Sequence, residues 1–193
     1  MRLFLLARHG QSLFNVDQVV NGDPALDRGL SEQGIEEAER LGSQLAALPL
    51  DLVAVSPFPR ALQTANIALD GREVAHLVEE DLGDVRIGEL EGKSLDAYRE
   101  SPGHHDRKVR FPGGESLDEA ALRYASAFER LLARDEQVTF VVCHEIPVRY
   151  LANAAAGSDD LNGPLHLVAN AAPYLFDEAS LGRAVGRVRE LAR

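Results

Sequence analysis

Three short apolar runs constrain the fold of this chain most strongly. They cover Leu3–Ala7, Leu52–Val55 and Val138–Cys143, and each run ends abruptly in polar residues. A helical pattern follows each run, either at once or after a loop. Short, unbroken apolar runs are typical of strands that are buried on both faces of a parallel sheet. Strands that alternate with helices predict an α/β fold, a three-layer α/β/α sandwich with a mostly parallel sheet.

The expected helices each have one apolar face. Between residues 117 and 131, apolar side chains recur at helical spacing, and Ser116 and Glu119 predict a capping box at the start of this helix. Two further helices are expected from Ile35 to Leu45 and from Ala61 to Leu69.

One domain is expected for residues 1–193, because this length suits a single hydrophobic core and no linker or internal repeat divides the chain. Ser101–Gly114 is expected to be an irregular loop, since it contains two prolines and three glycines. The C-terminal part offers two short strands, Leu165–Ala169 and Ala172–Phe176, followed by a polar amphipathic tail.

The composition argues for small ligands. A net charge of -11 disfavours binding to nucleic acid or to an acidic membrane surface. The single cysteine, Cys143, excludes an intrachain disulfide and a cysteine-based metal centre. The apolar run at residues 3–7 is too short for a signal peptide or a membrane span. A cytoplasmic protein is therefore expected, and its oligomeric state stays open.

Basic side chains follow the predicted strands. Arg8 and His9 come after the first, Arg60 follows the second, and His144 follows the third. Ligands bind beyond the carboxyl ends of strands in such sheets, so these residues predict a phosphate site there. His9 can attack phosphorus if one ring nitrogen is neutral. Gly10, directly after it, is expected to leave room for the substrate and to turn its N–H toward the anion.

The loop at residues 101–114 carries a basic cluster, His104 to Arg110. Arg107, Lys108 and Arg110 outnumber its single aspartate. The cluster is either a solvated loop or a group that recognises a second acidic group on the substrate.

Several ordered blocks resemble the histidine phosphatase superfamily, which includes the cofactor-dependent phosphoglycerate mutases. The first is the Arg-His-Gly triplet with a trailing serine and asparagine. The blocks span about residues 3–155 and are Arg8–Asn15, Leu30–Gly34, Ser56–Ala65, Gly88–Gly92, Phe111–Ser116 and Val141–His144.

This resemblance implies that His9 becomes phosphorylated, that Arg8, Arg60 and His144 bind the phosphoryl group, and that Asn15 lines the same pocket. Asn15 can alternatively cap a turn. No cofactor is implied. No metal is expected either, because the cationic side chains replace it and the sequence contains no suitable carboxylate cluster.

Two carboxyls compete for the role of proton donor. The superfamily usually has a glutamate four residues before the first glycine of the Gly-x-x-x-Gly block, and Asp84 stands there in this chain. Close relatives usually have glycine after the second histidine, where this chain has Glu145. A distant branch of the superfamily places its acid at that second position.

The expected function is hydrolysis of small phosphate monoesters through a phosphohistidine. One alternative is a phosphoglycerate mutase, which the short length of this chain disfavours, because the mutases that it resembles carry extra segments. A second alternative is a phosphate-binding module with impaired catalysis, to which the altered donor would point.

Overall fold

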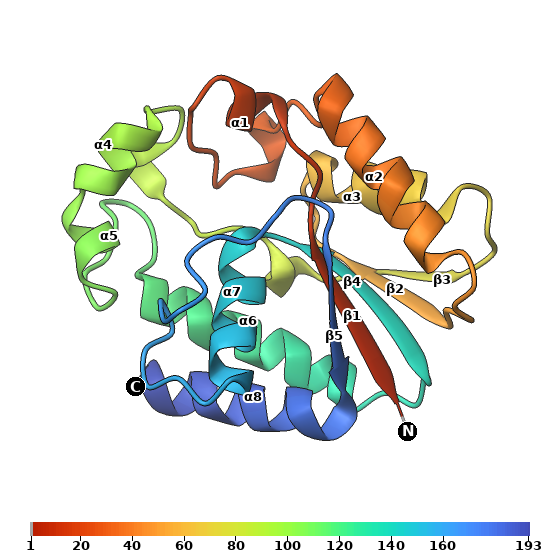
Figure 1. The fold of residues 1–193 in the computed structure, drawn as a ribbon. Coiled ribbons are helices and arrows are strands. Elements are labelled where there is room, and N and C mark those ends of the chain that lie inside the picture. Colours follow the sequence, from red (N-terminus) through yellow and green to blue (C-terminus); the bar gives the residue numbers. More distant parts are fainter. Residues whose placement is uncertain (1) are drawn as a thin grey trace.

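A computed structural model describes residues 2–193 and joins five strands into one sheet in the order β3-β2-β4-β1-β5 (Figure 1). All neighbouring strands are parallel except β5, which pairs antiparallel with β1. The strands are β1 (Leu3–Arg8), β2 (Leu52–Val55), β3 (Ala75–Val78), β4 (Val138–Cys143) and β5 (Pro173–Asp177).

Helices cover both faces of the sheet, as expected for an α/β/α sandwich. One face packs against α2 (Glu32–Leu45) and α3 (Pro59–Leu69), and the other against α6 (Leu117–Leu132), α7 (Glu145–Ala155) and α8 (Glu178–Leu191) (Figure 1). Alternate side chains of β1 enter the two cores: Phe4 and Leu6 lie on the α6 side, whereas Leu5 and Ala7 lie on the α2 side. Because both faces are covered, the strand is apolar throughout.

Short elements gather beyond the carboxyl ends of the parallel strands. The helices α1 (Leu13–Val16), α4 (Leu95–Glu100) and α5 (Pro102–His105) lie together at this end of the molecule (Figure 1). The segment expected to be irregular, Ser101–Gly114, therefore starts with a helical turn. Three 3-10 turns complete the elements: Pro24–Leu26, Glu80–Leu82 and Gly88–Leu90.

The predicted helices are confirmed, including the capping box of Ser116 and Glu119, and the three strands predicted from apolar runs are β1, β2 and β4. The strand expected at Leu165–Ala169 is wrong. The side chain of Asn153 takes the place of a neighbouring strand there, since it donates to the carbonyls of Leu161 and Leu165 and accepts from Leu165 N–H. The amphipathic tail forms α8, and the edge strand β3 was not expected.

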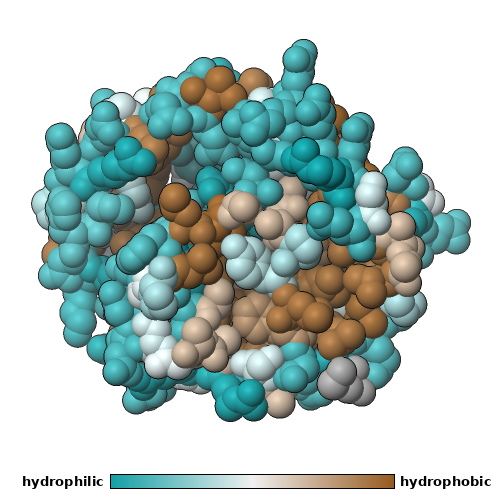
Figure 2. Space-filling view, viewed as in Figure 1, coloured by the Kyte–Doolittle hydropathy of each residue, from teal (hydrophilic) through white to brown (hydrophobic). Residues whose placement is uncertain are grey.

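The hydropathy of the surface differs between the two sides of the molecule in Figure 2. Hydrophilic residues cover most of the rim near α4 and α5, whereas hydrophobic residues gather nearer the edge strand β5 (Figure 2). Leu167 and Leu175 are among the exposed apolar side chains. Among residues 2–193, every helix is too short or too polar to cross a membrane.

Candidate active site

A cleft of about 610 Å³ opens at the carboxyl ends of the strands. Six of the seven residues predicted for the site line it: Arg8, His9, Asn15, Arg60, Asp84 and Glu145. The seventh, His144, is fully buried and lies behind this surface, in contact with Arg60 and Asp84. The strand ends thus bring the predicted side chains together, with His144 one layer deeper than the others.

The ring of His9 is oriented by the backbone. Its Nδ1 lies 2.7 Å from the carbonyl oxygen of Gly10, and its Nε2 lies 3.0 Å from Nε of Arg60. A carbonyl can only accept and a guanidinium can only donate, so this network assigns the proton to Nδ1 and a lone pair to Nε2. Burial, aided by the charges of Arg60, His144 and Arg8, holds the pKa of His9 well below its ordinary value. The ring is therefore neutral at pH 7.

Arg60 is the centre of the site. Its guanidinium is buried and donates to Nε2 of His9 at 3.0 Å, to Oδ1 of Asn21 at 2.6 Å and to Oδ2 of Asp84 at 2.9 Å. Asp27 lies 3.4 Å from the guanidinium and accepts the backbone N–H of Arg60 at 2.9 Å. A buried charge needs such partners, because desolvation otherwise costs several kcal/mol.

Asn21 and Asp27 were not predicted, although they hold Arg60. A further carboxylate, Glu91 of the Gly88–Gly92 block, accepts from Nδ2 of Asn21 and from the backbone N–H of Gly22, both at 2.7 Å. Sequence reasoning missed these residues because their importance lies in contacts with distant segments.

Gly10 has a different role from the one expected. A Cβ at this position would lie 2.4 Å from the carbonyl oxygen of Gly34, so the missing side chain permits close packing against α2 rather than substrate access. The N–H of Gly10 donates to Oγ1 of Thr64, not toward the cleft. This bond ties the end of β1 to α3, within which Thr64 in turn donates to the carbonyl of Arg60.

His144, which is fully buried, pairs with Asp84, which is partly exposed. Nδ1 of His144 lies 3.2 Å from Oδ2 of Asp84, and its Nε2 lies 2.7 Å from Oγ of Ser56. Burial lowers the pKa of His144, although Asp84 opposes the shift. Burial alone would raise the pKa of Asp84, but His144 and Arg60 outweigh it and lower that pKa. Asp84 is therefore ionised when no substrate is bound.

A second arginine, largely buried, positions the backbone at Asp84. Arg123 of α6 donates to the carbonyls of Asp81, Gly83 and Asp84 at 2.8–3.0 Å and pairs with Glu115. Arg123 was also missed. The sequence offered one signal, because Arg123 stands next to the apolar face of the helix predicted between residues 117 and 131. A charged residue in such a place is seldom buried unless it is paired, so a partner for Arg123 could have been expected.

Arg8 and Glu145 form an ion pair in the lining of the cleft. Nη1 of Arg8 lies 2.9 Å from Oε2 of Glu145 and donates to the carbonyl of Val168 at 3.0 Å. Glu145 also contacts Arg149, one turn further along α7, at 3.3 Å. One carboxylate is thus shared between two arginines.

Asn15 combines both roles considered for it. Its Oδ1 accepts the N–H of Ser12 at 3.0 Å, in the capping box of α1. The residue also lines the cleft, where its Nδ2 forms no hydrogen bond with any of residues 2–193.

The basic cluster of the loop does not face the cleft. Arg107 pairs with Asp118 at 3.2 Å, Lys108 donates to the carbonyl of Arg193, and Arg110 pairs with Glu119 at 3.1 Å. The expectation that these three cations recognise a second acidic group is therefore wrong. Of this cluster, His104 does line the cleft.

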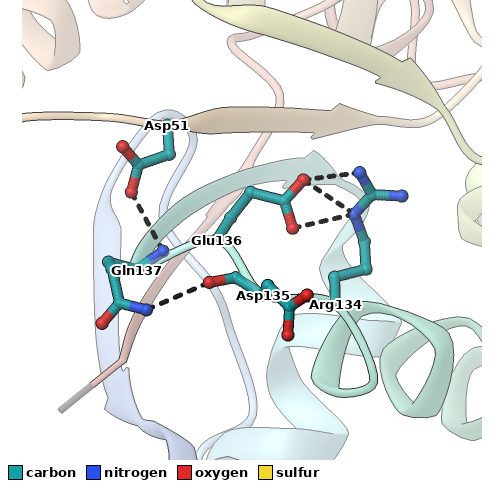
Figure 3. A pocket seen from close by; sticks show the side chains of 5 residues that line it. All are labelled: Asp51, Arg134, Asp135, Glu136 and Gln137. Carbon is teal, nitrogen blue, oxygen red and sulfur yellow. Dashed lines mark hydrogen bonds and ion pairs between the residues drawn. The ribbon is translucent and has the colours of Figure 1, made fainter.

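A second hollow lies at the opposite, amino end of the strands (Figure 3). Its polar groups satisfy one another: Arg134 pairs with Glu136, and Asp51 accepts from the backbone N–H of Gln137. This hollow is a junction between strands rather than a reactive site. Within residues 2–193, no cluster of three or more potential side-chain ligands could hold a metal.

Comparison with known proteins identifies the family. The model of the histidine phosphatase superfamily (branch 1) matches residues 4–188, and the chain therefore belongs to this superfamily.

Its relatives include mutases and phosphatases. The 2,3-bisphosphoglycerate-dependent phosphoglycerate mutase of Parvibaculum lavamentivorans is 36% identical over 140 residues, which cover 66% of each chain. Phosphoserine phosphatase 1 of Hydrogenobacter thermophilus is 29% identical over 80% of this chain and 76% of its own.

Solved structures confirm the fold. YhfR of Bacillus stearothermophilus superposes with a TM-score of 0.81 at 27% identity, over 92% of this chain and 91% of its own. A mycobacterial glucosyl-3-phosphoglycerate phosphatase, solved with VO3, gives a TM-score of 0.75 at 26% identity, over 92% of this chain and 93% of its own.

The pKa of His9 predicts a pH dependence of stability. The pKa of His9 is lower in the folded state than its ordinary value of 6.5, so the unfolded chain binds a proton that the folded chain does not. The free energy of unfolding should therefore fall as the pH drops below 6.5. Chemical denaturation at pH 7.5 and pH 5 should show a smaller fall for His9→Asn than for the native protein. The exposed His76 provides the control, and an equal fall in His9→Asn and His76→Asn would contradict the assignment.

Proposed function

We propose that this protein is a phosphatase that hydrolyses small phosphate monoesters of the cytoplasm through a phosphohistidine at Nε2 of His9. The observation that carries the proposal is the neutral ring of His9, whose lone pair faces a buried guanidinium in an open cleft. A nucleophile beside fixed cations is the arrangement that phosphoryl transfer requires.

The first step forms the phosphohistidine. Nε2 of His9 attacks phosphorus and the bond to the leaving oxygen breaks. The N–H groups of Arg60 that now donate to His9 and Asp84 turn to the phosphoryl oxygens, and Arg8 and Asn15 also bind these oxygens. His144 supports this arrangement through Arg60 and Asp84. Water then attacks phosphorus and releases His9 and inorganic phosphate.

The leaving alkoxide takes its proton from Asp84. This carboxyl is ionised without substrate, but an arriving phosphate dianion competes for Arg60 and adds like charge beside it. Both effects raise the pKa of Asp84, so the carboxyl can take up a proton and serve as general acid. Glu145 is the weaker candidate, because it already pairs with both Arg8 and Arg149.

Solvent access favours water over a second hydroxyl as the acceptor. The side chains of Asp84 and Glu145 are about a quarter exposed, so water can reach the site. A mutase instead needs an enclosed site, because it must retain a bisphosphate intermediate.

Chain length does not separate the two functions: the matched region covers 66% of both this chain and the Parvibaculum mutase, which is therefore of similar length.

The impaired binding module is the weaker alternative. Arg60 and His144 contact the carboxylate of Asp84, and Arg123 donates to its backbone carbonyl. The aspartate is therefore held in a fixed position in the site, which supports a catalytic role for it.

Replacing His9 tests the nucleophile. His9→Ala and the less disruptive His9→Asn should both abolish turnover of p-nitrophenyl phosphate, because each removes the attacking nitrogen. Circular dichroism and unfolding curves control for folding, since His9 is buried. Quenching without acid should trap label from substrate on His9 of the native protein. Label on a serine, or appreciable activity in either variant, would contradict the mechanism.

The leaving group identifies the acid. Asp84→Asn should slow the cleavage of alkyl phosphates far more than that of p-nitrophenyl phosphate, since p-nitrophenolate leaves without a proton. The difference should reach about 10²–10⁴-fold. Glu145→Gln is the matched control and should slow both substrates alike. If the leaving-group dependence appears in Glu145→Gln instead, the donor assignment is reversed.

A further inference from the structure

The strand β5 is an edge of the sheet with a free outer side. In the order β3-β2-β4-β1-β5, its one strand neighbour within residues 2–193 is β1. A free edge presents unpaired N–H and C=O groups that another strand can bind, and natural proteins often guard such edges with charged side chains. The strand reads Pro-Tyr-Leu-Phe-Asp, so it carries no charge before its last residue. This edge is therefore open to a further strand.

The hydrogen bonds of β1 show which groups of β5 point outward. The N–H groups of Leu3 and His9 donate to carbonyls on the β4 side. Alternate residues of a strand bond to the same neighbour, so the odd-numbered residues of β1 face β4 and the even-numbered ones face β5. The residues of β5 that lie opposite the odd-numbered ones therefore turn their backbone groups away from β1. They are Pro173, Leu175 and Asp177.

These outward groups are complementary to a second copy of the same strand. When two copies of β5 pair antiparallel about Leu175, the N–H and C=O of each Leu175 bond to the Leu175 of the other copy. The N–H of Asp177 then meets the C=O of Pro173. The donor that Pro173 lacks falls opposite the C=O of Asp177, which already accepts from Oγ of Ser180 at 3.0 Å. Every outward donor thus has an acceptor.

The register of this pairing is specified by the same groups. A shift by two residues in one direction would pair Leu175 with Pro173 and leave the C=O of Leu175 without a donor. A shift in the other direction would aim the N–H of Leu175 at the C=O of Asp177, which Ser180 already occupies. Pairing about Leu175 therefore satisfies more groups than either neighbouring register.

The side chain of Leu175 lies at the centre of this pairing. It is 65% exposed and stands on the same face of the sheet as Leu5, its neighbour on β1. In a directly opposed, hydrogen-bonded pair the two Cα atoms are about 5.5 Å apart, so the two Leu175 side chains would cover each other. The pairing thus removes apolar surface from water where it also satisfies the backbone.

Charge does not oppose association at this edge, although the chain carries a net charge of -11. The carboxylate of Asp177 accepts the N–H of Ser180 at 2.6 Å at the start of α8, and Glu178 pairs with Arg2. Antiparallel pairing places each Asp177 opposite Pro173, so the two carboxylates lie at opposite ends of the strand pair, about 14 Å apart along it. The edge is therefore a weakly charged part of an acidic surface.

We propose that β5 is the interface of a two-fold symmetric dimer, in which two antiparallel β5 strands join the sheets of two copies of this chain. A two-fold interface uses the same patch on both subunits, which this self-complementary edge provides. A five-residue strand is small against the roughly 800 Å² per partner of stable complexes, so we expect a weak dimer with a Kd of about 10–100 µM. The dimer does not depend on the proposed phosphatase function.

Sedimentation over a range of concentrations tests the dimer. From about 1 to 500 µM, the native protein should pass from monomer to dimer. Leu175→Lys should raise the Kd at least about tenfold, because the two ammonium groups would face each other across the axis. The matched control is Val78→Lys, which adds the same charge to the other edge strand at a side chain that is 48% exposed, and it should leave the Kd unchanged.

Crosslinking locates the interface. The one native cysteine, Cys143, is buried, and burial raises its pKa to about 12, so it should not react. Under mild oxidation, Leu175→Cys should form a covalent dimer, whereas Val78→Cys at the same concentration should stay monomeric. Circular dichroism controls for folding of the variants.

Three results would overturn the proposal. One is a native protein that stays monomeric over the whole concentration range. Another is a dimer whose Kd is the same in Leu175→Lys as in the native protein. The third is loss of association in Val78→Lys, or crosslinking of Val78→Cys that equals that of Leu175→Cys, since either would take the interface away from β5.

Discussion

The structure depends on the burial of one guanidinium. Arg60 is 3% exposed, and its partners come from segments that are far apart in the chain: His9 after β1, Asn21 and Asp27 from the following loop, and Asp84 before the glycine block. Leaving such a charge unpaired costs about 3–5 kcal/mol. The packing of these segments around Arg60 therefore also assembles the site, so folding and function rest on the same contacts.

The same principle positions the acid. Arg123 is largely buried and donates to three carbonyls of the segment Asp81–Asp84, those of Asp81, Gly83 and Asp84. The carboxylate of Asp84 balances the charge of Arg60. In the proposed mechanism, the phosphate of the substrate takes over this role. A dianionic substrate enters in this mechanism without leaving a buried cation unsatisfied, and its arrival raises the pKa of the carboxyl that donates the proton. Binding and acid catalysis are coupled through one ion pair.

The sequence predicted the sandwich, the strands β1, β2 and β4 and the residues that follow them, because apolar runs and strand ends are local features. It did not predict that Asn153 would replace a strand at Leu165–Ala169, nor that Arg107 would turn to Asp118. It also explained Gly10 by substrate access, whereas the packing of Gly34 requires it. These errors share a cause: each residue contacts another segment of the chain, and such a contact leaves no periodic pattern in the sequence.

The central claim is that phosphorus passes through a covalent bond to His9. Stereochemistry at phosphorus tests it most directly: a phosphorothioate monoester made chiral with oxygen isotopes is hydrolysed in labelled water, and the configuration of the product is determined. Two successive in-line displacements, one by Nε2 of His9 and one by water, predict net retention. Net inversion would show that water attacks directly and would contradict the phosphohistidine.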